Sequence, residues 1–334
     1  MSNGRRRREL ARADRVLPGL WRLRLPLPWP GVPHVNAWAI AAGSGIVLVD
    51  TGLHEPGAMR QLELALEGAG VRLEHVRLLV CTHAHSDHYG LAAPILEAAG
   101  CELWMHPNHE HMTNAAADPD RMLERRLEVA RQSGVPAKTL AGYEATRRGQ
   151  GVGVAEVVMP DRDLLPGVEV DTDLGTWQVY ETPGHAPSHV VLHQPERGLL
   201  LSGDHILGRV SLYYDFGYTP DPAGEFLTSL DTVSELDVQL VLSGHGRPVR
   251  DLQGLVATNR ATVAERVERV RRALAEGPRT PFEIVPALVD DEAPSGMMVS
   301  WGLSEVLCYL RHLELRGEVK SLEGEDPARW SLAA

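Results

Sequence analysis

Cysteine is scarce in this chain, with 3 among 334 residues. Cys81, Cys101 and Cys308 stand far apart, which excludes a disulfide scaffold and the paired cysteines of a zinc finger. So few cysteines fit a reducing compartment, and we expect the protein in the cytoplasm. Long apolar runs are absent too. No stretch reaches the roughly 18 residues of a membrane-spanning helix, and the first residues lack the apolar core of a signal peptide.

Lysine is also rare, occurring only at Lys138 and Lys320, and the formal net charge is −12. This charge argues against a broad nucleic-acid surface. The short basic run at residues 5–8 is interpreted as a solvated tail. Nucleic acid and membranes are therefore not expected partners, whereas a small-molecule substrate is. The length allows one large domain and a smaller one.

Histidine, in contrast, is concentrated at one place. The segment His83-Ala84-His85-Ser86-Asp87-His88 directly follows the apolar run 76–81. Imidazole and carboxylate are the ligands that zinc takes in catalytic sites, which keep one position open for water. A strand end followed by a loop lets all four side chains converge, so the segment predicts a metal site.

Three later segments repeat this form, each with an apolar run, a small residue and then one potential ligand. They end in His185, Asp204 and His245. A glycine directly before each ligand lets the backbone turn sharply and approach a metal. Upstream, the run 45–52 ends in Val-Asp-Thr-Gly and presents Asp50 in the same way.

The ordered set HxHxDH, PGH, SGD and GHG, preceded by VDTG, resembles the metallo-β-lactamase superfamily over about residues 20–250. The resemblance implies an α/β fold, a four-layer αβ/βα sandwich. It implies two Zn²⁺ ions, with Fe or Mn as alternatives. One ion would take His83, His85 and His185, and the second would take Asp87, His88 and His245. Asp204 would bridge them, and Asp50 would orient ligands through hydrogen bonds.

This ligand set predicts a dinuclear-metal hydrolase in which a metal-bound hydroxide attacks a small thioester, lactone or ester. Asp87 is the expected catalytic residue, orienting the nucleophile and moving a proton. The HxExD arrangement of flavodiiron oxygen reductases is absent. His88 and Asp204 resemble glyoxalase II-like thioesterases, lactonases and phosphodiesterases more than antibiotic hydrolases. The alternatives are a phosphodiesterase or endoribonuclease and a mononuclear-iron, persulfide-type dioxygenase, while a non-catalytic binding protein is disfavoured.

Residues 107–150 interrupt the alternation of strands and helices, and Asp118-Pro119 predicts a helix start there. We expect this helical insertion to act as a lid over the site, with a dimer contact as the alternative. His106, His109 and His111 open it, and we expect a solvated helix start rather than ligands. His189 is expected to be structural. Tyr213 or Tyr214 either donates to a substrate oxygen or packs in the core.

The character changes after His245. Helical patterns cover 253–276, 281–288 and 298–317, and 318–332 resembles a β-wing. The sequence therefore predicts a catalytic domain over 1–252 and a small winged-helix-like domain over 253–334, which resembles one attached to a branch of the superfamily. Because this region is acidic, we expect a structural or homodimerising role rather than nucleic-acid binding.

Overall fold

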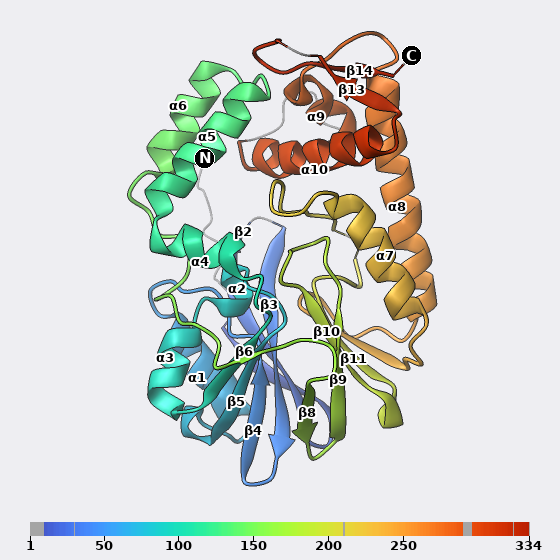
Figure 1. The fold of residues 1–334 in the computed structure, drawn as a ribbon. Coiled ribbons are helices and arrows are strands. Elements are labelled where there is room, and N and C mark those ends of the chain that lie inside the picture. The colour runs from blue at the N-terminus through green and yellow to red at the C-terminus, as the bar shows by residue number, and fades with distance from the viewer. Residues whose placement is uncertain (1–9, 30, 210, 290–295, 323, 334) are drawn as a thin grey trace, which may run out of the picture.

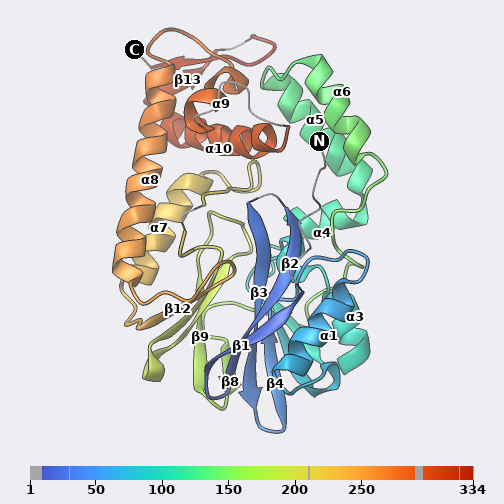
Figure 2. The same cartoon turned by 180° about the vertical axis from the view of Figure 1, so that it is seen from behind.

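The structure is a computed structural model that describes residues 10–29, 31–209, 211–289, 296–322 and 324–333 (Figure 1). The basic run 5–8 lies outside the described residues. Two β-sheets pack face to face, and helices cover their outer faces (Figures 1 and 2). Within the described residues, no helix combines the length and the apolarity needed to cross a bilayer.

The first sheet has seven strands in the order β1-β2-β3-β4-β5-β6-β7. It begins as an antiparallel meander and becomes parallel from β4 onward. The apolar runs of β4 and β5 form buried neighbouring strands, as parallel pairing requires. The strands are β1 (Arg12–Leu17), β2 (Leu20–Trp29), β3 (Val32–Ala42), β4 (Gly45–Val49), β5 (Val76–Cys81), β6 (Glu102–Met105) and β7 (Arg162–Asp163).

The second sheet has five strands in the order β12-β11-β10-β9-β8. They are β8 (Glu169–Thr172), β9 (Gly175–Glu181), β10 (Val190–Gln194), β11 (Leu199–Gly203) and β12 (Leu240–Ser243). One core cluster fills the space between the sheets, with Trp38 of β3 and Trp177 of β9 both fully buried. Each such side chain contributes about 1.5–3 kcal/mol or more through burial of its apolar surface.

Two further core clusters lie under the helices. Helices α1 (Ala58–Gly68) and α3 (Ala92–Ala99) pack on the outer face of the first sheet. Helices α7 (Pro222–Ser234) and α8 (Leu252–Ala273) pack on the second sheet. This is the predicted four-layer αβ/βα sandwich. The remaining short helices are the 3₁₀ turns η1 (Leu73–His75) and η2 (Pro195–Arg197) and helix α2 (Ser86–Tyr89).

The insertion forms three helices, α4 (Glu110–Ala117), α5 (Pro119–Gln132) and α6 (Ala137–Arg147). Asp118 caps α5 as predicted, since its Oδ1 accepts the backbone N–H of Arg121 at 3.0 Å. Helix α4 buries four of its eight residues, whereas α6, all of whose residues are described, buries no side chain. The insertion therefore has an anchored beginning and an exposed end.

The C-terminal region consists of α8, α9 (Pro281–Val289), α10 (Gly296–Leu315) and an antiparallel pair, β13 (Val319–Ser321) and β14 (Trp330–Leu332). Its buried side chains share one cluster with α7 and the second sheet. It also meets the end of α5, where Phe282 N–H donates to Ser133 O at 3.0 Å and Ala328 N–H donates to Gln132 O at 2.8 Å. The winged-helix-like assignment and the domain boundary at 252/253 stay predictions.

Candidate metal centre

Four segments bring the predicted site residues to one edge of the two sheets. His83 and His85 follow the end of β5, and α2 then carries Asp87 and His88. His185, Asp204 and His245 follow the ends of β9, β11 and β12. The structure therefore brings all seven predicted donors together.

The glycines before the donors lie where a larger residue would not fit, because a Cβ would clash with neighbouring atoms. Gly184 has φ +124°, and a Cβ there would lie 2.5 Å from the Phe226 backbone. A Cβ at Gly244 would lie 2.1 Å from Asp204 Oδ1. Any side chain at either position would displace a donor or its support.

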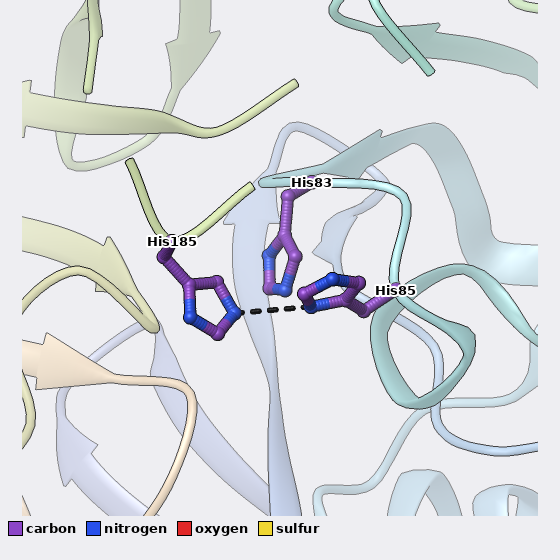
Figure 3. A group of neighbouring side chains, drawn as sticks. All are labelled: His83, His85 and His185. Atoms are coloured by element: carbon purple, nitrogen blue, oxygen red, sulfur yellow. Dashed lines mark hydrogen bonds between the residues drawn. The ribbon is translucent and has the colours of Figure 1, made fainter. Parts of the chain in front are cut away.

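His83, His85 and His185 form a group that we call the trihistidine half (Figure 3). His85 Nδ1 and His185 Nε2 face each other at 3.0 Å. Their other ring nitrogens are held from outside, with His185 Nδ1 3.1 Å from Tyr213 O and His85 Nε2 2.8 Å from Asp215 Oδ2. These outer contacts leave the inner nitrogens as lone-pair donors that point toward one centre.

Asp87, His88 and His245 form a second group, the carboxylate half. Asp87 Oδ2 lies 3.3 Å from His245 Nε2 and 3.6 Å from His88 Nε2. The outer nitrogens are again held, since His88 Nδ1 lies 2.8 Å from Asp50 Oδ2 and His245 Nδ1 lies 2.8 Å from His34 O. The carboxylate half thus resembles the trihistidine half, because its outer ring nitrogens are held by hydrogen bonds while its inner ones face the centre. It differs in having a carboxylate in place of one imidazole.

Asp204 lies between the two halves. Its Oδ2 is 3.1 Å from His245 Nε2 and 3.8 Å from His185 Nε2, and its Oδ1 is 3.4 Å from His88 Nε2. His189 fixes its backbone, because the Asp204 N–H donates to His189 Nε2 at 3.0 Å. The buried His189 therefore has the structural role expected of it, as a residue that positions Asp204.

Several buried polar atoms of this centre have no hydrogen-bond partner among the described residues. They are His83 Nε2, His88 Nε2, Asp87 Oδ2 and Asp204 Oδ1. Leaving one buried donor or acceptor unpaired costs about 1–3 kcal/mol. Four such atoms around one point fit divalent cations, for which neutral imidazole nitrogens and ionised carboxylates are ordinary ligands.

The charges of the centre favour a cation. Burial lowers the pKa of His185 to about 4, aided by His85, and lowers that of His83 well below its usual range, aided by His88. Burial also opposes the charged forms of His245 and Asp204. Their attraction nevertheless outweighs it, raising the pKa of His245 to about 10 and holding that of Asp204 well below its usual range. The carboxylates thus stay ionised and draw positive charge into the site.

Asp50 has the supporting role expected of it. Its Oδ1 accepts the Thr82 backbone N–H at 2.8 Å while its Oδ2 holds His88. Its φ of 63° is the positive value that non-glycine residues rarely adopt. Strain of this kind persists where the surroundings fix it, and here it aims the carboxylate at two neighbours.

The expectation of a solvated helix start at His106, His109 and His111 is wrong. Their exposed fractions are 2%, 5% and 4%. His106 Nε2 lies 2.8 Å from Glu181 Oε1, His109 Nδ1 lies 3.1 Å from Thr113 Oγ1, and His111 Nδ1 lies 2.9 Å from Asp215 Oδ2. Two of these partners come from distant segments, so nothing in the local pattern indicated the burial.

The two tyrosines after Asp204 differ. Tyr214 is fully buried and packs against Phe226 and Tyr309, as expected of a core residue. Tyr213 lies beside the site, with its ring 5.6 Å from that of His85 and its hydroxyl donating to Asp215 Oδ1 at 3.1 Å. Asp215 itself was not predicted, because a single Asp in a loop carries no signal of its own.

Comparison with known proteins agrees with this geometry. The family description "Metallo-beta-lactamase superfamily" matches residues 30–245, well over half of the chain. The chain belongs to the metallo-β-lactamase superfamily. Its histidine and aspartate clusters are able to bind metal, which is the ligand chemistry of a metallo-hydrolase.

Individual relatives extend beyond that region. The chain is 28% identical over 298 residues to "Probable metallo-hydrolase YqjP" of Bacillus subtilis, covering 85% of this chain and 91% of that protein. A metallo-β-lactamase family protein from Thermus thermophilus is 28% identical, with a TM-score of 0.82 and coverage of 95% of this chain and 100% of the other. A β-lactamase domain protein from Burkholderia ambifaria is 29% identical, with a TM-score of 0.84 and coverage of 96% and 94%.

Proposed function

We propose that the protein is a dinuclear-metal hydrolase of small acyl substrates, with thioesters, lactones and esters first. The trihistidine half would hold one ion, the carboxylate half would hold the other, and Asp204 would contact both. The observation that carries this proposal is the set of seven converging donors, four of which present to one centre buried atoms that have no hydrogen-bond partner among the described residues. Zinc suits these donors best, and iron or manganese is compatible with them.

Two divalent ions, when bound, lower the pKa of a water molecule and polarise the oxygen of the scissile acyl group. The chain supplies the rest of the chemistry. Asp87 is the proposed catalytic residue, because its buried carboxylate faces the centre, where it would orient the nucleophile and move a proton. Asp50 keeps the His88 imidazole oriented, since its Oδ2 lies 2.8 Å from His88 Nδ1.

A cysteine nucleophile does not fit. Cys81 is buried at the end of β5, and its Sγ donates weakly to His88 O at 3.7 Å. Burial, together with the nearby Asp50, raises the pKa of this thiol well above its usual value. A thiol held in this protonated form is a poor nucleophile, so activated water is the proposed attacking group.

The rival functions predict other outcomes in the same experiment. Protein purified without added metal is analysed by elemental mass spectrometry and then assayed against thioesters, lactones, esters, phosphodiesters and single-stranded RNA. About two zinc ions per chain with acyl hydrolysis is the expected result. One iron per chain with oxygen consumption would instead favour the persulfide-type dioxygenase. Cleavage restricted to phosphodiesters or RNA would favour the nuclease alternative.

A further inference from the structure

We propose that His111 of the insertion and Asp215 position the ligand His85, so that helix α4 is a working part of the metal centre rather than only a cover. This inference rests on the proposed function, because it assigns the support of one of the proposed ligands. Neither residue belongs to the motifs that define the site, and both come from segments outside the two sheets.

Asp215 is the common partner in this arrangement. Its Oδ2 accepts from His85 Nε2 at 2.8 Å and from His111 Nδ1 at 2.9 Å. Its Oδ1 accepts the Tyr213 hydroxyl at 3.1 Å. With its side chain 12% exposed, the carboxylate is nearly enclosed by these three donors. The His85 proton is thereby fixed on Nε2, which leaves Nδ1 as the donor that faces His185.

His111 is held from its other side as well. Its Nε2 lies 2.8 Å from Ser188 Oγ, and that oxygen accepts the Ala84 backbone N–H at 3.0 Å. If the serine hydroxyl donates to Nε2, a neutral His111 donates from Nδ1 to Asp215 and every group is satisfied. The contacts then run from Ala84 through Ser188, His111 and Asp215 back to His85, closing a ring around the first metal-binding turn.

The separations favour hydrogen bonds over a further metal site here. His85, His111 and Asp215 do form a compact group of metal-ligand types. However, both imidazoles approach the carboxylate at 2.8–2.9 Å, the ordinary length of a charge-assisted hydrogen bond.

Two variants of His111 separate its two contacts. His111→Asn keeps an amide N–H near the Nδ1 position and so retains a donor for Asp215. His111→Gln places its amide near Nε2, where it meets Ser188 but leaves Asp215 without that donor. His109→Gln is the matched control, because His109 is equally buried at the start of α4 but contacts Thr113.

The readout is the affinity for each of two Co²⁺ ions, measured by titration against a competing chelator and by the visible spectrum of bound Co²⁺. We expect His111→Gln to weaken one of the two sites by about 10-fold or more, as loss of a ligand's supporting hydrogen bond does. We expect His111→Asn and His109→Gln to keep both affinities. A general loss of packing would instead affect the control variant as well.

Unchanged binding of both ions by His111→Gln would overturn the positioning role and leave the hydrolase proposal standing. A wild-type protein that binds no metal would overturn both. If His111→Gln does not fold, Asp215→Asn takes its place, because it keeps the side-chain shape while losing the charge shared by His85 and His111. A loss of Co²⁺ affinity at one of the two sites in Asp215→Asn supports the inference, and unchanged affinity at both sites overturns it.

Discussion

The two halves of the metal centre differ in what holds them. The carboxylate half is supported from the sandwich itself, by Asp50 at the end of β4 and by the carbonyl of His34 in β3. The trihistidine half depends on segments outside the two sheets, since Tyr213 and Asp215 lie in a loop and His111 lies in the insertion. One half is therefore supported by the strands, and the other is supported by a loop and the helical insertion.

Substitution of Asp204 tests whether the two halves act together, and we expect it to have the largest effect on hydrolysis. Asp204→Ala removes a carboxylate that approaches both groups. We expect kcat/KM for acyl hydrolysis to fall on the order of 10³-fold or more, since several kcal/mol of transition-state stabilisation depend on the bound ions. Steady-state assays with metal analysis measure this, and Asp163→Ala, at an exposed aspartate, is the control. Retained hydrolysis in Asp204→Ala would refute the dinuclear site.

Asp50→Asn tests the half that the sandwich supports. Asparagine tolerates positive φ, so the backbone is expected to keep its conformation while the charge facing His88 is lost. We expect the affinity for one metal ion to fall about 10–100-fold and the other to change little. Chelator titration measures both, and an equal loss at both positions would contradict the division into halves.

We expect metal removal to increase amide hydrogen exchange unequally in the segments that support the two halves. Because metal binds only the folded site, its loss destabilises the segments that support the ligands. We expect amide exchange in α4 to accelerate about 10-fold on treatment with a chelator, while the central strand β3 stays protected. Hydrogen exchange followed by mass spectrometry resolves the two segments. Equal acceleration in both would mean that the insertion has no special tie to the metal.

The smallest effect is expected outside both halves, at Asp221. This residue caps α7 through Gly224 N–H at 3.0 Å and meets His312 Nδ1 at 2.9 Å. Burial opposes its ionisation, but His312 and the capped N–H outweigh this and lower the pKa of Asp221. The stabilisation that ionised Asp221 gives the folded protein is therefore fully present above the usual aspartate pKa. It is lost as the pH falls through the lowered pKa.

We accordingly expect Asp221→Ala to cost about 1 kcal/mol of unfolding free energy at pH 7, and less near pH 3. Urea unfolding at both pH values measures the difference in unfolding free energy between the variant and the wild type. Metal-free protein is used for both, because bound metal would dissociate in acid and change the stability by itself. Both metal affinities should stay unchanged at pH 7. A cost that grew in acid would contradict the assigned direction of the pKa shift.

The sequence predicted what local patterns encode. Each apolar run that ends in glycine and a ligand is a strand end, and α5 starts where Asp118-Pro119 indicated. The burial of His111 and the part played by Asp215 could not be predicted, because they meet only after the chain has folded. Periodicity describes a residue's own element, and it says little about a single contact between a helix and a distant loop.

The two backbone hydrogen bonds between the end of α5 and the C-terminal region set a limit on how short this protein can be made. A chain truncated after Gly246 would keep every proposed metal donor. It would lose Phe282 and Ala328, which anchor α5, and with them a brace of the insertion that carries His111. We therefore expect the smallest working version of this protein to extend well past its last proposed ligand, to segments that carry no proposed metal donor.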